Sequence, residues 1–513
     1  MENTFFKDEH GNPMFLLGLQ SHNSSTGSPL IDDAISAVKK MGGNVLEAPV
    51  YWYWLEPEKG VYDTSHVKEL IAKVRSAGLK LVVLWFATNK NGHPNYAPEY
   101  VKLNPGIYKL AVGSDGAPIP SMSPHCSETL LADKLAFIEL MKCIKEEDSR
   151  HETVIAVQVE NETGLGGSDR DYSETAQKDF EKAVPDALKD ISIKASGASN
   201  SDNTWRGKYG RYAHEAFTAW HHAVYTDTIA AAGKQIFDIP MYVNAMLGGA
   251  YDEGGITYNS GGPVVRVLDI WKKGAPNIDL LCPDIYNTGR DEYEHFCKEY
   301  SRKDNPLFIP ETGFRGEAAA LNIIRAAAKY EAIGICCFGA ESTLDSEGEI
   351  NEISKDTAIS FNIIKNISPL LIKYRGTGKI HAVIQEEFTS SKYLELEKYH
   401  IMARFDLTRM AQKGSSSRGR GILVQADEYE FYFAGDNVGL DFIRRPQPDD
   451  DNPFIWLKSR QSTQLNFLSV EEGHFEEGHW VVDFNRNGDE SNFELYSKNG
   501  KVVRIRLNPN IKP

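Results

Sequence analysis

Two glutamates stand at the carboxyl ends of strand-like apolar runs. Glu162 follows TVIAVQVEN (153–161), and Glu311 follows NPLFIP (305–310). Carboxylates are costly to bury unpaired, so acidic groups at the ends of buried strands are unusual, although either one alone could be a solvated strand end. Two such carboxyls facing each other could cleave a glycosidic bond. One would protonate the leaving oxygen, and the other would attack the anomeric carbon or activate water.

The elements that must position this pair are short apolar runs that alternate with amphipathic helices such as 29–43 and 64–78. Their continuous apolarity is typical of parallel strands covered on both faces. The pattern predicts an α/β fold, a (β/α)8 TIM barrel. A doubly wound open sheet is the rival, and the barrel is favoured because polar residues end several different runs. The eight runs are 14–20, 44–52, 79–86, 153–160, 239–246, 278–286, 306–312 and 333–340.

The sequence pattern changes after about residue 370. There apolar and polar residues alternate within short segments, and clusters of Gly, Asn, Asp and Pro separate these segments. Such alternation predicts an antiparallel β-sandwich. We therefore expect a catalytic barrel over residues 1–365 and a C-terminal β-sandwich domain over residues 366–513. Residues 163–212 interrupt the alternation of apolar runs and amphipathic helices with a polar, helix-prone stretch. This stretch predicts an excursion over the face of the barrel that carries Glu162.

Composition narrows the function classes. The 513 residues carry a net charge of −16 and are 41% hydrophobic, so the chain can bury a sizeable core. The acidic balance argues against nucleic acid as a partner. No run is long enough to cross a bilayer, and no secretory signal is visible at the N-terminus, so we expect no membrane partner and a cytoplasmic location. Six scattered cysteines fit reduced, mostly buried thiols. A homo-oligomer is left open.

No motif for a metal or a cofactor is found. His214-Glu215 is not part of an HExxH motif, His125 stands alone, and adjacent His221 and His222 point to different helix faces. The chain has no zinc-spaced ligand set, Walker loop or dinucleotide fingerprint. We therefore expect neither a metal nor a cofactor.

Several motifs together resemble clan A of the glycoside hydrolases, and within it the family 35 β-galactosidases. Asn161-Glu162 in VQVENETG resembles the acid/base segment after the fourth strand, and Glu311 in IPETGF resembles the nucleophile after the seventh. NVLEAPVYWYWLEPEKGVYD resembles the second strand and its loop. The likeness covers roughly residues 5–360. It implies that Glu162 is the general acid/base and Glu311 the nucleophile.

The resemblance and the barrel geometry together suggest further sugar contacts. Asn161 resembles the clan asparagine that bonds the sugar 2-hydroxyl, and Tyr286 resembles the tyrosine that bonds the nucleophile, although it could be a core residue. Aromatic strand ends could stack on sugar or simply pack: Tyr51, Trp52 and Trp85. Glu47 could hold sugar hydroxyls or a buried ion pair. Weaker candidates of the same sort are His22, Asn23, Asn91 and Asn244, with Phe338 and Glu341 as candidate pocket walls.

The expected function is a retaining exo-β-galactosidase that releases terminal β-linked galactose from oligosaccharides or plant glycan side chains. Departures from the family pattern keep the sugar open: Glu162-Thr163-Gly164 replaces Glu-Tyr-Gly, and the first strand reads LGLQSHNSS. One alternative is a β-glucosidase or other exo-β-glycosidase of the same fold. Another is a carbohydrate-binding protein without catalysis, against which the intact pair of glutamates argues.

Overall fold

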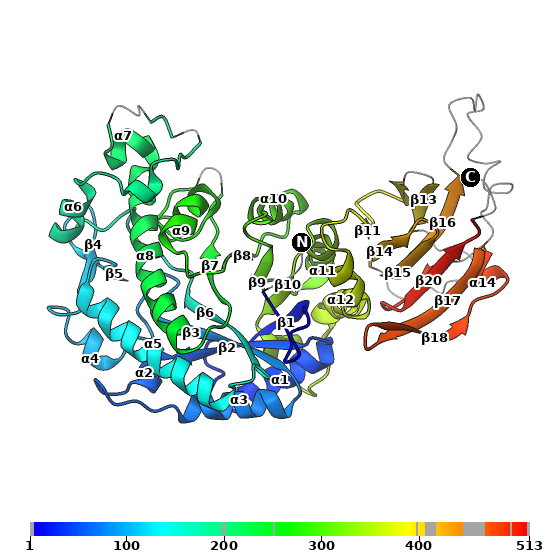
Figure 1. Cartoon of the computed structure of the whole chain (residues 1–513), viewed down its shortest axis with the longest axis horizontal. Coiled ribbons are helices and arrows are strands. Elements are labelled where there is room, and N and C mark those ends of the chain that lie inside the picture. Colours follow the sequence, from blue (N-terminus) through cyan, green and yellow to red (C-terminus); the bar gives the residue numbers. More distant parts are fainter. Residues whose placement is uncertain are drawn as a thin grey trace.

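The computed structural model describes residues 5–194, 196–198, 202–249, 252–396, 399–405, 417–444, 467–492 and 495–509. Its larger part is a closed barrel of parallel strands in the order β1-β10-β9-β8-β7-β6-β3-β2. The expected (β/α)8 barrel is therefore confirmed (Figure 1). The strands are β1 (Leu16–Gln20), β2 (Val45–Tyr51), β3 (Lys80–Lys90), β6 (Val154–Asn161), β7 (Met241–Met246), β8 (Leu280–Ile285), β9 (Phe308–Thr312) and β10 (Gly334–Phe338).

Each of the eight predicted apolar runs forms one of these strands. Almost every strand residue is buried, because one face of the sheet lines the barrel interior and the other packs under the helices. This double burial explains the continuous apolarity of the runs. The surrounding helices are α1 (Leu30–Met41), α3 (Ser65–Ser76), α5 (Ser127–Glu147), α8 (Ala213–Ile236), α9 (Leu268–Gly274), α10 (Arg290–Tyr300), α11 (Gly316–Ile324) and α12 (Lys355–Tyr374).

Two long connections depart from the simple alternation of strand and helix. The one between β3 and α5 contains α4 (Glu99–Lys102) and a hairpin of β4 (Leu110–Val112) and β5 (Pro118–Met122). The one between β6 and α8 is the predicted excursion, and it contains α6 (Glu174–Phe180) and α7 (Trp205–Tyr209). Both start from the carboxyl ends of strands, so they extend the face on which barrel enzymes place their chemistry. A short helix, α2 (Trp52–Leu55), follows β2.

The C-terminal region consists of two antiparallel sheets, as predicted. Side chains from both sheets share one core, among them Ile401, Leu423, Phe433, Phe442 and Ile505, so the sheets form a sandwich. The first has the order β11-β14-β15-β20-β17-β18, and the second β12-β13-β16-β19. Their bounds are β11 (Ile380–Ile384), β12 (Ser391–Glu395), β13 (Tyr399–Arg404), β14 (Arg420–Asp427), β15 (Glu430–Asp436), β16 (Val438–Arg444), β17 (Phe467–Glu476), β18 (His479–Asn485), β19 (Tyr496–Ser497) and β20 (Val502–Leu507), with α14 (Asp489–Asn492).

Helix α12 joins the two units. Its buried Phe361 and Ile364 belong to the barrel core, and the same core includes Ile422 and Val424 of β14. The intervening Leu423 points into the sandwich core instead, so both faces of this sheet are covered. The expected boundary at residues 365–366 lies inside α12, and we propose that the chain segment after Tyr374 separates the units.

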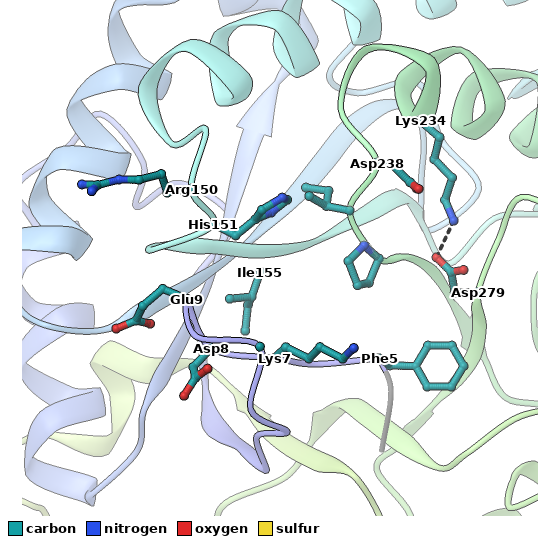
Figure 2. Close-up of a pocket in the computed structure, with 13 residues that line it drawn as sticks. Phe5, Lys7, Asp8, Glu9, Arg150, His151, Ile155, Lys234, Asp238 and Asp279 are labelled. Carbon is teal, nitrogen blue, oxygen red and sulfur yellow. Dashed lines mark hydrogen bonds and ion pairs between the residues drawn. The ribbon is translucent and has the colours of Figure 1, made fainter. Parts of the chain in front are cut away.

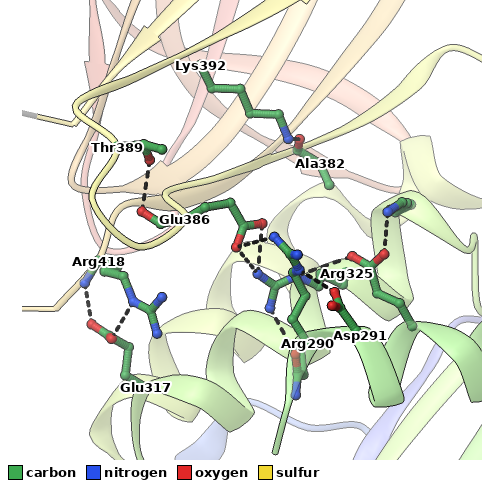
Figure 3. Close-up of polar contacts among 12 residues, drawn as sticks. Arg290, Asp291, Glu317, Arg325, Ala382, Glu386, Thr389, Lys392 and Arg418 are labelled. Atoms are coloured by element: carbon green, nitrogen blue, oxygen red, sulfur yellow. Dashed lines mark hydrogen bonds and ion pairs between the residues drawn. The ribbon is translucent and has the colours of Figure 1, made fainter.

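Ion pairs add to this junction (Figure 3). Arg325, at the end of the α11 region, donates to both carboxylate oxygens of Glu386, which lies between β11 and β12, at 2.9 and 2.8 Å. Arg418, just before β14, donates to Glu317 of α11 through its backbone N–H and its side chain. One nitrogen, Nη2, makes both of the Arg325 contacts, while Nη1 donates to Asn322 at 2.9 Å, and Arg325 itself is buried. These contacts orient the sandwich on the barrel.

The cysteines and the helix lengths can be set against the expectations from the sequence. All six cysteines are buried and none is in a disulfide, as expected for reduced thiols. Among the described residues, no helix is long and apolar enough to span a membrane.

Candidate active site

The structure brings Glu162 and Glu311 together. Glu162 follows the last residue of β6, and Glu311 is the next-to-last residue of β9, so both lie at the carboxyl end of the barrel. Their nearest carboxylate oxygens are within 4.8 Å of each other. Glu162 is 6% exposed and Glu311 is 4% exposed, so both are buried yet still reach the surface. The two acids expected to share a site therefore do.

Glu311 is held by hydrogen-bond donors from four strands or strand ends. Its Oε1 accepts from the side-chain amides of Gln20 and Asn161, each at 3.1 Å, and of Asn244 at 3.3 Å. Its Oε2 accepts from the hydroxyl of Tyr286 at 2.7 Å. A side chain that accepts four hydrogen bonds is suited to being an ionised carboxylate in a fixed orientation. Such orientation is what an attacking group requires.

The backbone around Glu162 is strained. Glu160 and Glu162 have φ of 63° and 46°, a region that few residues other than glycine adopt. Glu162 is fixed there by Asn244, whose Oδ1 accepts from its N–H at 2.9 Å, and by Asn259, whose amide donates to its carbonyl at 2.7 Å. Such conformations cost about 1–3 kcal/mol each and persist where the surroundings enforce them. With this backbone conformation, a carboxylate oxygen of Glu162 lies within 4.8 Å of one of Glu311.

The environment of Glu162 suits a general acid. Burial, and after it the charge of Glu311, raises the pKa of Glu162 from its usual range to about 7. The charge of Lys90 and a hydrogen bond with Asp284 lower this pKa and oppose part of the rise. A carboxyl with this pKa is protonated about half of the time at neutral pH, and it can both give and take a proton. The same cause underlies the acid roles of carboxyls in other glycosidases.

Asp284, in β8, is a third carboxyl that sequence reasoning missed. One oxygen of each of Glu162, Asp284 and Glu311 falls within the same 4.8 Å. Burial first, and then the charges of Glu311 and Glu162, raise the pKa of Asp284 well above its usual range. Asp284 Oδ2 accepts from Asn244 at 2.7 Å, while Oδ1 has no N–H or hydroxyl partner. A proton held by Asp284 and donated to Glu162 satisfies both carboxyls.

This arrangement predicts opposite behaviour for two Asp284 variants. Asp284→Ala removes a donor that stabilises charged Glu162, so the pKa of Glu162 should rise. The loss of one hydrogen bond to a charged group corresponds to a rise of about one pKa unit. The alkaline limb of kcat/KM should then move upward from pH 7. Asp284→Asn keeps a donor at the same place and should leave that limb nearly unchanged. The pH profiles of both variants on one chromogenic glycoside measure the difference, and equal shifts in the two would refute the role.

Lys90 and Gln20 were also missed. Lys90 ends β3, is only 8% exposed, and donates to Asn161 Oδ1 at 2.8 Å. Gln20 ends β1 and donates to Glu311. Both are polar residues at the end of an apolar strand, which is the signal that identified Glu162. Lys90 was overlooked because β3 continues to residue 90, four residues past the predicted run.

A second acidic pair lies behind the site. Asp133 and Glu160 are fully buried, and burial raises the pKa of both, for Glu160 well above its usual range. Glu160 accepts from the hydroxyl of Thr88 at 2.8 Å and from the N–H of Asn89 at 2.7 Å. A proton shared between the two carboxyls lets both be buried. The pair fixes the end of β6 against β3, next to Glu162.

Three predicted aromatic contacts are hydrogen-bonded to groups other than Glu162 and Glu311. Trp85 is fully buried and its indole N–H donates to Asp133 at 2.9 Å, under helix α5. Trp52 is fully buried and donates to Glu56 at 2.8 Å. Tyr51 is 2% exposed and donates to the carbonyl of Asn23 at 2.7 Å. The packing alternative weighed for these residues fits their positions, and we do not propose them as sugar contacts.

The remaining candidates fall into two groups. Glu47 is fully buried inside the barrel, accepts from Tyr242 at 3.0 Å, and has a pKa that burial raises well above its usual range, so it is a neutral interior acid. The others form a rim beside the site. Glu341 accepts from the His22 N–H and the Ser25 hydroxyl, and the His22 ring lies edge-on to Phe338 at 5.4 Å. The Asn91 N–H donates to the carbonyl of Asn161 at 3.1 Å.

The opposite end of the barrel contains a cavity of about 650 Å³ (Figure 2). Its lining includes Phe5, Ile155 and Asp279, at the amino-terminal ends of the strands. Lys234 and Asp279 pair on one side of it at 2.7 Å (Figure 2). Barrel enzymes place their chemistry at the other end, and no described group here repeats the glutamate pairing.

Comparisons with known proteins agree with the barrel. A family model described as β-galactosidase, that of family 42, matches residues 25–225. A second model, described as a domain of unknown function (DUF5597), matches residues 357–496. No curated protein matches the sequence.

Several solved structures are similar to the barrel of this chain. A catalytic mutant of a family 42 β-galactosidase from G. stearothermophilus has a TM-score of 0.51 and 12% identity, over 72% of this chain and 59% of that one. The β-galactosidase of Bacillus circulans sp. alkalophilus has a TM-score of 0.50 and 14% identity, over 69% and 56%. The β-amylase catalytic domain of Paenibacillus polymyxa has a TM-score of 0.50 and 14% identity, over 67% and 98%.

At these identities the structural likeness shows the fold alone, and the chain spans less than two thirds of both β-galactosidase chains. The expected likeness to family 35 specifically is not confirmed. Over residues 25–225 the chain is similar to the family 42 β-galactosidases, and this match indicates a glycoside hydrolase.

Proposed function

We propose that this protein is a retaining exo-β-glycosidase, and that terminal β-linked galactose is the sugar it releases from oligosaccharides or plant glycan side chains. The observation that carries the proposal is the approach of Glu162 and Glu311 to within 4.8 Å at the carboxyl end of the barrel. Retaining enzymes separate their carboxyls by about 5–5.5 Å, and inverting enzymes by about 6.5–9.5 Å to admit a water. The similarity to β-galactosidases over residues 25–225 supports the sugar.

In the first half-reaction, Glu162 donates its proton to the glycosidic oxygen while Glu311 attacks the anomeric carbon. The aglycone leaves as an alcohol, and a covalent glycosyl-enzyme forms on Glu311. Tyr286 and the three amides keep the Glu311 oxygens in position for this attack. Asn161 also lies where it could bond the sugar 2-hydroxyl, a contact that strengthens at the transition state.

The second half-reaction uses the electrostatic coupling of the two acids. Once Glu311 is esterified its negative charge is gone, and so is one cause of the raised pKa of Glu162. The pKa of Glu162 therefore falls, and its carboxylate becomes the base that takes a proton from water. Water then attacks the anomeric carbon and releases the sugar with its original β configuration. Asp284 supports this base form through its hydrogen bond.

The same site could serve another terminal β-sugar, because the hydroxyl contacts decide the sugar and the first strand departs from the family 35 pattern. A chromogenic panel separates these cases: nitrophenyl β-galactoside, β-glucoside and β-N-acetylglucosaminide, with the α-galactoside as control. We expect the β-galactoside to have the highest kcat/KM and the α-galactoside to be inert. Proton NMR of the first product should show the β-anomer. Binding of these sugars without turnover would favour a carbohydrate-binding protein instead.

A further inference from the structure

A cluster of metal-ligating side chains lies where the excursion meets α8 and the start of α5, and it includes neither Glu162 nor Glu311. His125 precedes α5, Asp179 belongs to α6, and His221 lies on α8, as the order of these helices shows (Figure 1). His125 Nδ1 and Asp179 Oδ2 are 3.1 Å apart, and the rings of His125 and His221 have centroids 4.1 Å apart. One ligand atom from each residue falls within 4.8 Å of the other two. Sequence spacing gave no sign of the cluster, because its members are 54 and 42 residues apart.

The donor set suits a divalent transition metal. Two imidazole nitrogens and one carboxylate oxygen are typical zinc ligands, and a water completes a tetrahedral site. Metal–ligand bonds of about 2.0–2.2 Å place neighbouring ligand atoms about 3.3 Å apart, close to the distance between His125 and Asp179. The remaining gap needs adjustments of about 1–1.5 Å, which rotation of a histidine side chain supplies. The Asp179 side chain is 25% exposed, so an ion has a path in from its side, while the His125 side chain is 3% exposed.

The surroundings prepare these groups as ligands. Phe217 stacks on the His125 ring with centroids at 5.3 Å and contacts His221 at 4.5 Å, which restricts both rings. Lys182 binds Asp179 Oδ1 at 2.6 Å and leaves Oδ2 toward the histidines. Oriented rings and a second partner on the carboxylate are typical of zinc sites.

We propose that His125, Asp179 and His221 bind one zinc ion, which fastens α6 to the barrel helices α5 and α8. Asp179 is the ligand contributed by the excursion, from α6, a helix of seven residues whose Phe180 packs against Phe217 of α8. The ion would therefore hold α6 in place, and with it the excursion that follows Glu162 at the end of β6. The proposal is independent of the glycosidase assignment, because it rests on other side chains.

The test uses the full chain stripped with EDTA and titrated with Zn²⁺ by calorimetry. We expect one ion per chain, and an upward Tm shift of about 2–5 °C at saturating zinc. Co²⁺ in its place should give the visible absorption bands of a four-coordinate site. Asp179→Asn and His221→Ala should weaken binding at least tenfold. His214→Ala is the matched control, because His214 also lies on α8 and pairs with Asp169 at 2.5 Å, but among the described residues the two belong to no group of three metal-ligating side chains.

The outcomes decide the proposal without reference to activity. Tight binding by the wild type and His214→Ala, with loss in the other two variants, supports it. Asp179→Asn preserves shape, so it gives an answer even if His221→Ala fails to fold. Absence of stoichiometric zinc in the wild type, or binding that survives both ligand variants, would overturn it. Loss of binding in His214→Ala as well would also overturn it, since the ion would then lie elsewhere.

Discussion

Replacing Glu311 with alanine should lower kcat/KM for nitrophenyl β-galactoside by roughly 10⁴–10⁶-fold, because the variant has no group to attack the anomeric carbon. The fold should survive, since Glu311 lies at a strand end and its four donors can turn to water. Azide is small enough to enter the vacated space and should restore part of the rate. The product should be the α-glycosyl azide, which proton NMR identifies.

The control for this variant is Glu317→Ala, six residues along the chain and paired with Arg418 rather than with the site. It should retain near wild-type kcat/KM. Comparable activity in wild type and Glu311→Ala would remove Glu311 from the reaction. A β-glycosyl azide from the Glu311 variant would contradict direct attack by this residue.

Replacing Glu162 with alanine should have a smaller effect that depends on the leaving group. General acid catalysis contributes about 10²–10⁴-fold, and it matters most where the departing alcohol is a poor leaving group. Dinitrophenyl β-galactoside needs little protonation, so its glycosyl-enzyme should still form, accumulate and give a burst of dinitrophenolate. Azide should then speed turnover and yield the β-glycosyl azide.

The pH profile gives a second readout for the same variant. In the wild type the alkaline limb of kcat/KM should follow the deprotonation of Glu162 near pH 7. Without Glu162 this limb should disappear for the dinitrophenyl substrate. Glu174→Ala, a change at an exposed residue paired with Lys178, is the control and should keep the limb. A Glu162 variant equally slow on good and poor leaving groups would argue that the residue shapes the site and is not the acid.

The match to family 42 covers residues 25–225 and so ends before Glu311, which lies in the second half of the barrel. The geometry therefore adds an independent reason for the assignment, because the strand pairing places Asp284 of β8 beside Glu311 of β9. The Asp284 variants and the Glu311 variant test this half of the site, which lies outside the residues that the family 42 model matches.

The amino-acid sequence by itself determined the eight barrel strands, the change to antiparallel sheets and the two glutamates. Long apolar runs form buried strands whatever their neighbours, and an acidic residue at the end of such a run conflicts with burial unless it has a role. Glu162 and Glu311 could be named for this reason, and Asn161 and Tyr286 from the resemblance to clan A. Their signals are local, so no knowledge of packing was needed.

Only the tertiary structure decided which way the other side chains point. In a strand buried on both faces, apolar residues alternate between barrel interior and helix layer without any change in polarity. The sequence therefore could not show that Trp85 lies under α5. Asp284 lies inside an apolar run, so its polarity did not stand out. His125, Asp179 and His221 come from the connection before α5, from α6 and from α8, and only the folded chain brings them together. Proximity between distant segments depends on packing, which residue spacing does not encode.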